Sequence, residues 1–361
     1  MLKVAKIMKI DNLQKKALGA LNEIIKEVPF AHIDSSRLPE PKDEESGAPS
    51  AAGMVVIKLP EKEQVLLIET RPSGEPRFVR EVVNQLYRSR ENYPGAYGIL
   101  IAPYISARSA QICKEEGLGF IDFAGNCFLS FDRVFINREG NPNPFNEKRT
   151  LRSLFSTKAT RIIRVLLHNP GKMWKMKHLA RESEVSLGQV FAVKEMLLDR
   201  EWVTAERDGI KITEPSLLLK NWADNYTYTR NQVSDYYTML SLDECELKLA
   251  SFCEENNIDY GISGFSVAAM LAPSVKYNRS MIYVQGDREL LARTLGMKQA
   301  ESGANVILMT PYDKGVFYGS TKKDSMRIVS PVQLFLDLHS IPGRGQEAAE
   351  RLYEEVISKG W

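Results

Sequence analysis

The stretch 157–214 constrains the fold of this chain more than any other, because turn and cap residues divide it at short intervals. A first helix is expected to begin at Thr157 or Thr160, whose hydroxyl groups can cap it, and to end at the Asn-Pro-Gly sequence of residues 169–171. A short second helix is expected over 175–182, and a tight turn then leads into a third helix.

The third helix is expected to begin at Ser186, because Ser186 and Gln189 have the spacing of a capping box. Two short β-prone runs, 202–204 and 210–213, come next and flank an Asp-Gly pair, which is a hairpin signal. The order helix, helix, turn, helix, hairpin predicts a winged helix-turn-helix.

Positive charge is concentrated in this same stretch. From Arg149 to Lys220 the chain has 14 Lys and Arg and 8 Asp and Glu, a local charge of 14 − 8 = +6, whereas the whole chain carries +2. A local excess of this kind is expected where a protein contacts phosphate groups. The sequence therefore predicts double-stranded DNA as the partner of the winged helix.

The N-terminal end of the third helix is expected to enter a major groove, where Gln189 can pair with adenine and Phe191 or Ala192 can touch a thymine methyl group. The residues that we expect to contact DNA are Arg161, Arg164, Lys175, Lys177, Ser186, Gln189, Phe191, Ala192, Lys194, Arg207 and Lys211. Two alternatives stay open here: winged helices also dock proteins, and Gln189 can act as a cap residue alone.

The chain of 361 residues is long enough for two or three domains. The start of the sequence reads as an amphipathic segment and not as a signal peptide, and no apolar run approaches the ~20 residues of a membrane span. The four cysteines form no CxxC pair and the four histidines are scattered, so we expect reduced thiols, no metal site and no cofactor. These features are typical of a cytoplasmic protein without a membrane segment.

The first 147 residues are expected to form an α/β layer with a mixed sheet. An opening helix is expected over 11–27 and a polar, Pro- and Gly-rich loop over 35–53. Further strands are expected at 54–59, 64–70, 98–102, 119–122 and 127–131, and helices at 77–90 and 107–116.

Glu69 and Arg71 lie at i and i+2 on one expected strand, which is followed by a helix that holds Gln85. This pattern resembles the PD-(D/E)xK nuclease core, in which the carboxylate holds Mg²⁺ and the cation steadies the scissile phosphate. Arg71 stands where that family has Lys, and Asp122 is the substitute for a missing metal-binding Asp. The resemblance implies a restriction-endonuclease-like sheet, with either a structural Glu–Arg pair or a Mg²⁺-dependent endonuclease that uses Glu69, Arg71 and Asp122. The second hypothesis requires Asp122 to lie within a few ångströms of Glu69.

The remaining residues, 217–361, are expected to begin with a long aromatic-rich helix over 217–237 that serves as an interdomain or dimer packing surface. An αβ alternation follows. Helices are expected at 247–256, 265–272, 288–295 and 346–359, and strands just before residue 260, at 280–284 and at 306–310.

The sequence GISGFSVAA at 261–269, with a hydrophobic strand about fifteen residues later, resembles the opening of a nucleotidyltransferase fold. In active members a Gly-Ser pair cradles triphosphate and two strand carboxylates hold metal ions. This chain has Ser263 and Gly264 but carries Tyr-Val-Gln at 283–285 in place of the carboxylates, so nucleotidyl transfer is not expected.

The winged helix, this transferase-like segment and the ending VSPVQLFLDLHSIPGRGQEAAERL together resemble the AbiEi-type antitoxins of type IV toxin–antitoxin systems, over residues 150–361. The resemblance implies a DNA-binding autorepressor whose operon also encodes a nucleotidyltransferase-like toxin. The nuclease-like domain in front departs from the simplest form of that family.

We therefore expect an α/β (α+β) multidomain protein with a nuclease-like domain at 1–147, a winged helix-turn-helix at 148–216 and a nucleotidyltransferase-like domain at 217–361. Its expected function is transcriptional regulation without catalysis, with double-stranded DNA and a cognate nucleotidyltransferase-like toxin as partners. A homodimer is expected because helix-turn-helix proteins commonly read two half-sites. The alternatives are the Mg²⁺-dependent DNA endonuclease and a winged-helix module that binds a partner protein.

Overall fold

The structure, a computed structural model, describes residues 2–37, 53–144, 153–207, 209–272 and 277–361. The chain divides into two compact units, Met1–Lys148 with Asp199–Glu201 and Arg149–Leu198 with Trp202–Trp361. Each unit combines helices with a mixed sheet, which confirms the multidomain α/β class. Within the described ranges, no helix combines the length and the apolar character of a membrane span.

The first unit is built on one mixed sheet. In chain order its strands are β1 (His32–Arg37), β2 (Gly53–Lys58), β3 (Glu63–Thr70), β4 (Tyr97–Ala102), β5 (Gly119–Asp122), β6 (Cys127–Phe131) and β7 (Val134–Arg138). Their order in the sheet is the same as their order in the chain. The pairs β3–β4 and β4–β5 are parallel and the other neighbouring pairs are antiparallel.

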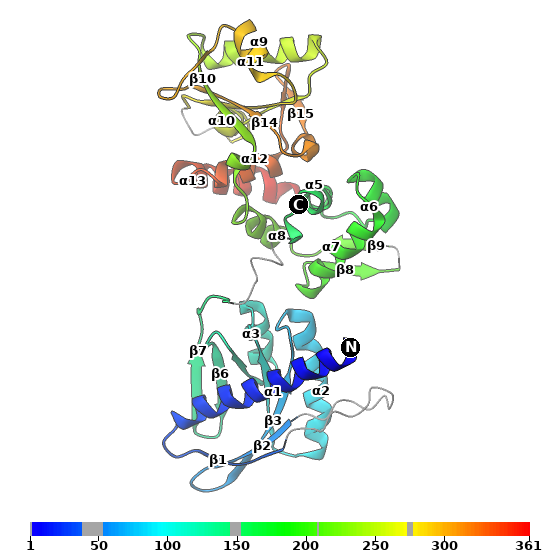
Figure 1. Cartoon of the computed structure of the whole chain (residues 1–361), viewed down its shortest axis with the longest axis vertical. Helices are drawn as coiled ribbons and strands as arrows, with labels where there is room; N and C mark the ends of the chain where they lie inside the picture. The colour runs from blue at the N-terminus through cyan, green and yellow to red at the C-terminus, as the bar shows by residue number, and fades with distance from the viewer. Residues whose placement is uncertain (1, 38–52, 145–152, 208, 273–276) are drawn as a thin grey trace. The chain divides into compact units, whose positions relative to one another are not determined.

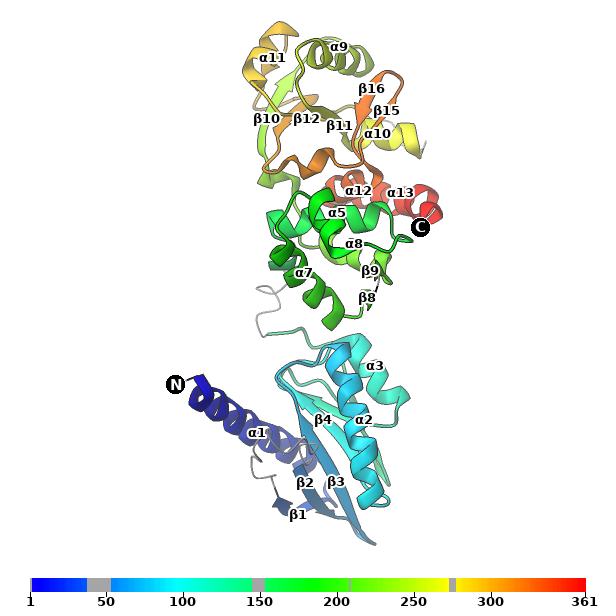
Figure 2. The ribbon, with the colours of Figure 1, turned by 90° about the vertical axis from the view of Figure 1, so that its right-hand side faces the viewer.

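Helices cover both faces of this sheet: α1 (Leu2–Lys26) on one face, and α2 (Pro76–Asn92) and α3 (Ala107–Glu115) on the other (Figures 1 and 2). The alternation of strand side chains explains this arrangement, because successive residues point to opposite faces. Leu66 on β3 packs in the same cluster as Leu21 of α1, whereas the next residue, Leu67, packs in the cluster of Leu86 of α2.

Three expectations for the first unit need correction. The opening helix starts at Leu2 and not at residue 11. The expected loop over 35–53 begins inside strand β1, which pairs antiparallel with β2 through Arg37, and its residues 38–52 lie outside the described part of the chain. Strand β7 was not predicted, because its sequence, VFINR, does not alternate between apolar and polar residues.

The second unit begins with the winged helix, which we define as α5 (Thr157–His168), α6 (Met176–Glu182), α7 (Leu187–Asp199), β8 (Val203–Glu206) and β9 (Gly209–Ile212). These elements follow the predicted order. Ser156, and neither Thr157 nor Thr160, stands at the N-cap of α5, and its side chain makes no capping hydrogen bond.

The wing is fixed by a close approach of two backbone segments. Trp174 and Ile210 exchange both backbone hydrogen bonds, so the residue two before α6 pairs with β9. Gly209 makes this approach feasible: its φ is +142°, and a Cβ atom there would lie 2.1 Å from the carbonyl oxygen of Trp174.

The rest of the second unit is a second mixed sheet with helices on both faces. Its helices are α8 (Pro215–Ala223), α9 (Leu242–Glu255), α10 (Gly264–Leu271), α11 (Arg288–Thr294), α12 (Pro331–His339) and α13 (Arg344–Leu352). Its strands are β10 (Gln232–Tyr237), β11 (Tyr260–Ser263), β12 (Ser280–Val284), β13 (Lys298–Gln299), β14 (Val306–Thr310), β15 (Thr321–Lys323) and β16 (Met326–Ile328). Their order in the sheet is β13-β10-β14-β12-β11-β16-β15.

Strand β12 shows which helices cover which face. Ser280 donates its hydroxyl hydrogen to Glu246 on α9, whereas Tyr283 donates to Asp337 on α12 at 2.7 Å. The two residues are an odd number of positions apart and point to opposite faces. Helix α9 therefore lies on one face of the sheet and α12 on the other, as Figure 1 shows.

The expected long helix over 217–237 is wrong. Helix α8 ends at Ala223, a single 3-10 turn occupies Tyr228–Arg230, and Gln232–Tyr237 is strand β10, which pairs with β14. The aromatic and β-branched residues of this segment, such as Val233, Tyr236 and Tyr237, favour a strand over a helix. The expected closing helix also differs, since α13 ends at Leu352 and continues as a π turn over Tyr353–Ile357. The strand expected just before residue 260 is instead Tyr260–Ser263 itself.

The winged helix and the second sheet share one hydrophobic core. The cluster that contains Leu166 of α5 and Val193 of α7 also contains Trp222 of α8, Ile282 of β12 and Phe335 of α12. The winged helix is therefore packed as part of the second unit.

Candidate nucleic-acid interface

Helix α7 divides its side chains between the core and the surface. Val190, Val193 and Leu197 are buried in the shared core. On the other side Phe191 is 46% exposed and Ala192 is exposed beside it. The predicted recognition helix thus presents a surface on which both residues are accessible.

One of the two predicted capping hydrogen bonds is present at the start of α7. The backbone N–H of Gln189 donates to the hydroxyl oxygen of Ser186 at 3.2 Å, which is one half of the expected capping box. The Ser186 side chain is exposed and Gln189 is half-buried. No acidic residue lies in the first turn of α7, so nothing there repels a phosphate group.

Four of the predicted DNA-binding cations are exposed: Lys175 at the start of α6, Lys177 within α6, and Arg207 and Lys211 in the wing. Lys194 on α7 is half-buried, with its Nζ 3.3 Å from Glu195 and 5.7 Å from the centre of the Phe191 ring. The exposed cations come from α6 and from the hairpin, the two elements that flank α7 in the sequence.

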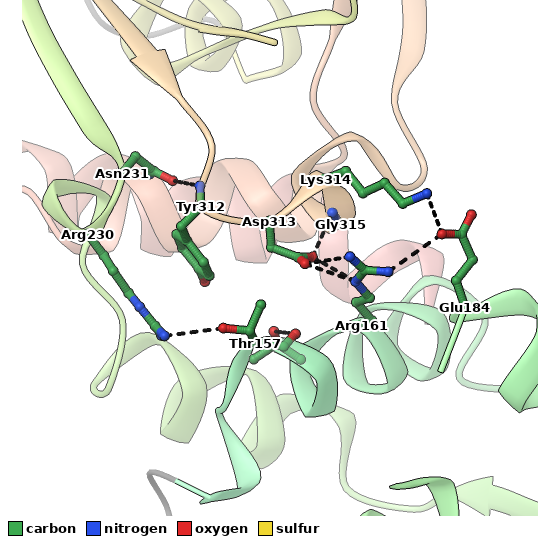
Figure 3. Close-up of polar contacts among 10 residues, drawn as sticks. Thr157, Arg161, Glu184, Arg230, Asn231, Tyr312, Asp313, Lys314 and Gly315 are labelled. Atoms are coloured by element: carbon green, nitrogen blue, oxygen red, sulfur yellow. Dashed lines mark hydrogen bonds and ion pairs between the residues drawn. The ribbon is translucent and has the colours of Figure 1, made fainter. Parts of the chain in front are cut away.

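Arg161 and Arg164 do not lie on this surface, contrary to our expectation. Arg161 forms a bidentate pair with Asp313 in the loop before a 3-10 turn at Lys314–Phe317; its Nη2 is 2.6 Å from Oδ2 and its Nε is 2.9 Å from Oδ1 (Figure 3). Hydrogen bonding to Asp313 raises the pKa of Arg161. Arg164 is only 4% exposed, with its guanidinium 4.8 Å from the centre of the Trp222 ring. Both arginines are held inside the second unit, because the face of α5 that carries them is turned toward the core.

The turn between α6 and α7 is tied to the same loop. Glu184 has a φ of +51°, which is uncommon for a residue with a side chain. Its Oε2 forms ion pairs with Lys314 Nζ at 2.5 Å and with Arg161 Nη1 at 3.5 Å (Figure 3). The hydrogen bond from Lys314 is the main reason that the pKa of Glu184 is lowered. Two cations therefore hold the connection that leads into α7.

In the first unit, Glu69 and Arg71 form the predicted pair. The Arg71 Nη1 donates to Glu69 Oε2 at 3.1 Å, and its Nη2 donates to the side-chain oxygen of Gln85 on α2. Glu69 is buried, and no residue that the structure describes forms a hydrogen bond with its Oε1. Burial raises the pKa of Glu69, and the charge of Arg71 opposes that shift.

Asp122 is separated from this pair. Residue Glu69 of β3 lies beside Leu100 of β4, and Asp122 of β5 lies beside Ala102 on the far side of β4, so two strand spacings of about 4.8 Å each separate the backbones. The Asp122 carboxylate also accepts four hydrogen bonds, from the backbone N–H groups of Ile105, Ala124 and Asn126 and from the Asn126 side chain. It closes the β5–β6 turn and is not placed beside Glu69, so the requirement of the nuclease hypothesis is not met. Among the described residues no group of three His, Cys, Asp or Glu side chains is arranged to hold a metal ion.

The positions that resemble a nucleotidyltransferase site hold a closed polar cluster. Ser263 donates to Asp337 Oδ2 at 2.6 Å, and Tyr226 and Tyr283 both donate to Asp337 Oδ1 at 2.7 Å. The Gln333 side-chain amide donates to the same Oδ1 at 2.8 Å. Burial raises the pKa of Asp337, against the effect of these hydrogen bonds. The Ser263 hydroxyl is thus buried and already bonded.

This cluster, which we call the Asp337 cluster (Tyr226, Ser263, Tyr283, Gln333 and Asp337), was not predicted from the sequence. A signal was present: Gln333 and Asp337 lie four residues apart in an otherwise apolar run, which places both on one helical face. Buried polar residues at this spacing are expected to bond to each other or to a common partner.

The comparisons with known proteins concern mainly the second unit. Residues 211–358 match one family model. Its description is transcriptional regulator, AbiEi antitoxin, type IV toxin–antitoxin system. The match runs from the wing through the second sheet to the end of the chain, and α5, α6 and α7 lie before it.

A search of curated proteins found no match. Among solved structures, that of EndoMS in its apo form is similar at 21% sequence identity; the match covers 28% of this chain and 44% of that chain, with a TM-score of 0.20. The matched region is thus less than half of the EndoMS chain.

Proposed function

We propose that this protein is a DNA-binding transcriptional regulator of the AbiEi antitoxin type, which represses its own operon and needs no catalysis. One observation carries the proposal: the third helix of a winged helix has an exposed N-terminal half, and the two elements that flank it in the sequence, α6 and the wing, both carry exposed cations. The family match over 211–358 supports the regulatory role. The DNA-binding part rests on the winged-helix geometry, because the recognition helix lies outside the match.

In this proposal α7 enters a major groove, with Gln189, Phe191 and Ala192 toward the bases. Lys175 and Lys177 bind phosphates on one side, and Arg207 and Lys211 of the wing bind phosphates or the minor groove on the other. Ser186 and Lys194 lie next to the backbone contacts. Arg161 and Arg164 are left out of this set, because both are turned into the second unit.

The partners follow from the same proposal. An antitoxin of this type has a cognate toxin, which we propose to be nucleotidyltransferase-like, and a homodimer would read two half-sites. The three-domain division at residues 147 and 216 remains part of the proposal, with Glu69 and Arg71 as a structural pair. The regulator would act in the cytoplasm, where its DNA is, and its four cysteines are buried free thiols.

The test is a gel shift of the full chain with DNA from upstream of its own coding region and with an unrelated DNA of the same length. Each reaction is run at two salt concentrations, once with Mg²⁺ and once with a chelator. We expect a shift of the upstream DNA that weakens steeply with salt, because counterion release accompanies phosphate binding. The DNA should remain intact in every lane. Cleavage that needs Mg²⁺ and disappears in Glu69→Ala would replace the proposal with the nuclease.

A second candidate, the protein-docking module, is favoured by one observation. Leu187 and Phe191 lie four residues apart on α7 and are 36% and 46% exposed, which makes an apolar patch on its outer face. A thymine methyl group and an apolar partner protein would both fit such a patch. If no DNA is shifted at low salt, the docking module becomes the better account.

A further inference from the structure

A cavity of about 190 Å³ lies between the winged helix and the loop that follows β14. Its walls come from α5, from the turn between α6 and α7, and from the 3-10 turn at Lys314–Phe317 and Tyr318 beyond it. All of these elements belong to the second unit. An apolar cavity of about 150 Å³ accommodates benzene, so this one has room for a molecule of a similar size with a polar head group.

Most of the charged groups in the wall are already paired. Arg161 is bonded to Asp313 and Lys314 to Glu184 (Figure 3). Glu182 accepts a hydrogen bond from the Tyr318 hydroxyl at 3.0 Å. The two ion pairs neutralise their own charges, and the hydrogen bond from Tyr318 fixes the Glu182 carboxylate, which keeps its negative charge. One further charged group lines the wall.

That group is Arg164. It is 4% exposed, lines the cavity, and its buried Nη1 has no hydrogen-bond partner among the described residues. In the described part of the chain no carboxylate forms an ion pair with Arg164; its contact is the Trp222 ring. A buried guanidinium with an unused donor is costly, because the charge has lost water and gained no anion in return.

The residue beside the Arg164 guanidinium is a glycine, which has no side chain to fill the cavity. Gly315 lies against it, and a Cβ atom at Gly315 would be 3.3 Å from Arg164 Nε and 2.7 Å from Asp313 Oδ1. Any side chain at this position would press on Arg164 and on the partner of Arg161. The absence of one keeps the approach to Arg164 open.

We infer that this cavity binds a small organic anion, whose carboxylate or phosphate oxygen accepts from Arg164 and whose apolar body packs against Val165 and the Tyr318 ring. Guanidinium groups bind both kinds of head group through charge-assisted hydrogen bonds. The wall includes the turn at Glu182–Glu184 that leads into α7, so the anion is placed to change the setting of the recognition helix. Binding itself is independent of the proposed function; the effect on DNA rests on it.

The binding step is tested by titration calorimetry of the full chain without DNA, with benzoate, phenyl phosphate and inorganic phosphate as probes. Benzamide is the neutral match for benzoate. We expect saturable binding of benzoate or phenyl phosphate, and binding of benzamide weaker by about tenfold or more, as for the loss of one charge-assisted hydrogen bond. The two organic probes separate a carboxylate from a phosphate ligand. Equal binding of benzamide and benzoate, or no binding of any of the three anions up to millimolar concentrations, would overturn the inference.

Three variants locate the site. Arg164→Met is expected to abolish binding, and Arg351→Met, which changes an exposed arginine of α13 in the same unit, is expected to leave it unchanged. Lys314→Met changes an exposed side chain of the wall and should weaken binding several-fold without affecting folding, so it decides the matter if Arg164→Met does not fold. Wild-type affinity in both wall variants would contradict the assignment.

The coupling is tested by repeating a DNA titration with and without a saturating concentration of the probe that binds. We expect the DNA affinity to change by about fivefold, a typical coupling between two sites, and to be insensitive to the probe in Arg164→Met. If the anion binds and the DNA affinity does not change, the coupling is contradicted, but the assignment of the anion site still holds. A chain that binds the anion but no DNA would instead overturn the proposed function.

Discussion

The two faces of the winged helix use the same kinds of side chain in opposite ways. On the inner face, toward the second sheet, Arg161 is paired with Asp313 and Arg164 is buried against the Trp222 ring. Just beyond the winged helix, Tyr226 is buried and bonded to Asp337. On the outer face Lys175 and Lys177 are exposed. The inner groups are therefore expected to contribute stability and the outer groups binding.

The charge that such a stretch offers to a phosphate group therefore depends on where its cations point as well as on how many there are. A lysine or arginine adds to the local charge wherever its side chain points, but only an exposed one is available to a phosphate group. Exposed ion pairs contribute little to stability, whereas breaking a buried pair leaves a charge without compensation. Substitutions on the inner face are therefore expected to lower the unfolding free energy, and substitutions on the outer face to lower the affinity for DNA.

The largest effect on the inner face is expected for Asp337→Leu. The substitution removes the acceptor of four buried donors. The Ser263 hydroxyl loses its acceptor, and of the Tyr226 and Tyr283 hydroxyl groups, which lie 3.1 Å apart, only one can donate to the other. We expect the second unit to lose about 4 kcal/mol of unfolding free energy, at the upper end for a single substitution. Urea unfolding, with hydrogen exchange of peptides from β11 and α12, measures this loss. Unchanged exchange in these peptides would show that the cluster does not stabilise the unit.

Asp337→Asn is the matched control for charge, and it makes the pH dependence testable. Burial raises the pKa of Asp337 in the folded state above the usual value of 3.8. The stability that comes from this shift is fully present below the unfolded-state pKa and is lost as the pH rises through the folded-state pKa. The unfolding free energy of wild type minus that of Asp337→Asn should therefore fall as the pH rises from about 4. A difference that grows with pH would mean that Asp337 is stabilised as a carboxylate.

The next largest effect is expected on the outer face, for the double change Lys175→Glu and Lys177→Glu. It replaces two phosphate-binding cations with two repelling carboxylates, so DNA affinity should fall by about 100-fold at moderate salt. Both side chains are exposed, and the unfolding free energy should stay within about 0.5 kcal/mol of wild type. Fluorescence anisotropy with labelled operator DNA measures the affinity.

The control for this double change is Lys248→Glu with Lys359→Glu, two exposed lysines of the same unit that lie outside the winged helix. It alters the net charge of the chain by the same amount. If the control lowers the affinity as much as Lys175→Glu with Lys177→Glu does, the effect belongs to the overall charge and α6 does not face DNA.

The sequence was sufficient to predict the winged helix, because its caps, breaks and hairpin signal are local. It was also sufficient for β2 to β6 of the first sheet and for β12 and β14 of the second, which show alternation or apolar runs. It did not distinguish Arg161 and Arg164 from Lys175 and Lys177. All four are cations in or next to short helices, and their direction is set by Asp313 and Trp222, which are distant in the sequence.

The same limit applies at two other places. The helix expected over 217–237 rested on aromatic spacing, but strand β10 is stabilised by its pairing with β14, about seventy residues later in the chain. The sequence also left open whether Asp122 lies near Glu69, as the nuclease hypothesis required, because the position of β4 between their strands is set by the sheet. Both depend on sheet topology, which no local pattern specifies.

Arg161→Ala should reverse the pattern of the double lysine change. Removing the guanidinium leaves the largely buried Asp313 without its bidentate partner, so we expect a loss of about 2 kcal/mol of stability. DNA affinity should change less than twofold in the folded protein. A double-mutant cycle with Asp313→Ala measures the coupling between the two side chains. An affinity loss comparable to that of the lysine variant would place Arg161 on the DNA face after all.

A smaller and more selective effect is expected for Gln189→Ala. If Gln189 pairs with an adenine, the variant should lose about 1–3 kcal/mol of discrimination at one base pair and keep its salt dependence. Binding to a set of operator variants, each changed at one position, measures this. The N–H that bonds to Ser186 is a backbone group and remains in the variant, so the helix cap is retained. Equal weakening on all variants would support the alternative that Gln189 acts only at the start of the helix.

The smallest effect is expected for Arg207→Ala in the wing. Its side chain is exposed, so the fold should be unaffected, and its predicted role is one phosphate contact. The slope of log affinity against log salt concentration should fall by about 1, and the affinity should fall by the same factor on every sequence. Arg351→Ala, an exposed arginine outside the winged helix, should leave both unchanged. A sequence-dependent loss in Arg207→Ala would show instead that the wing reads bases in the minor groove, and the outer face would then carry specificity at two places.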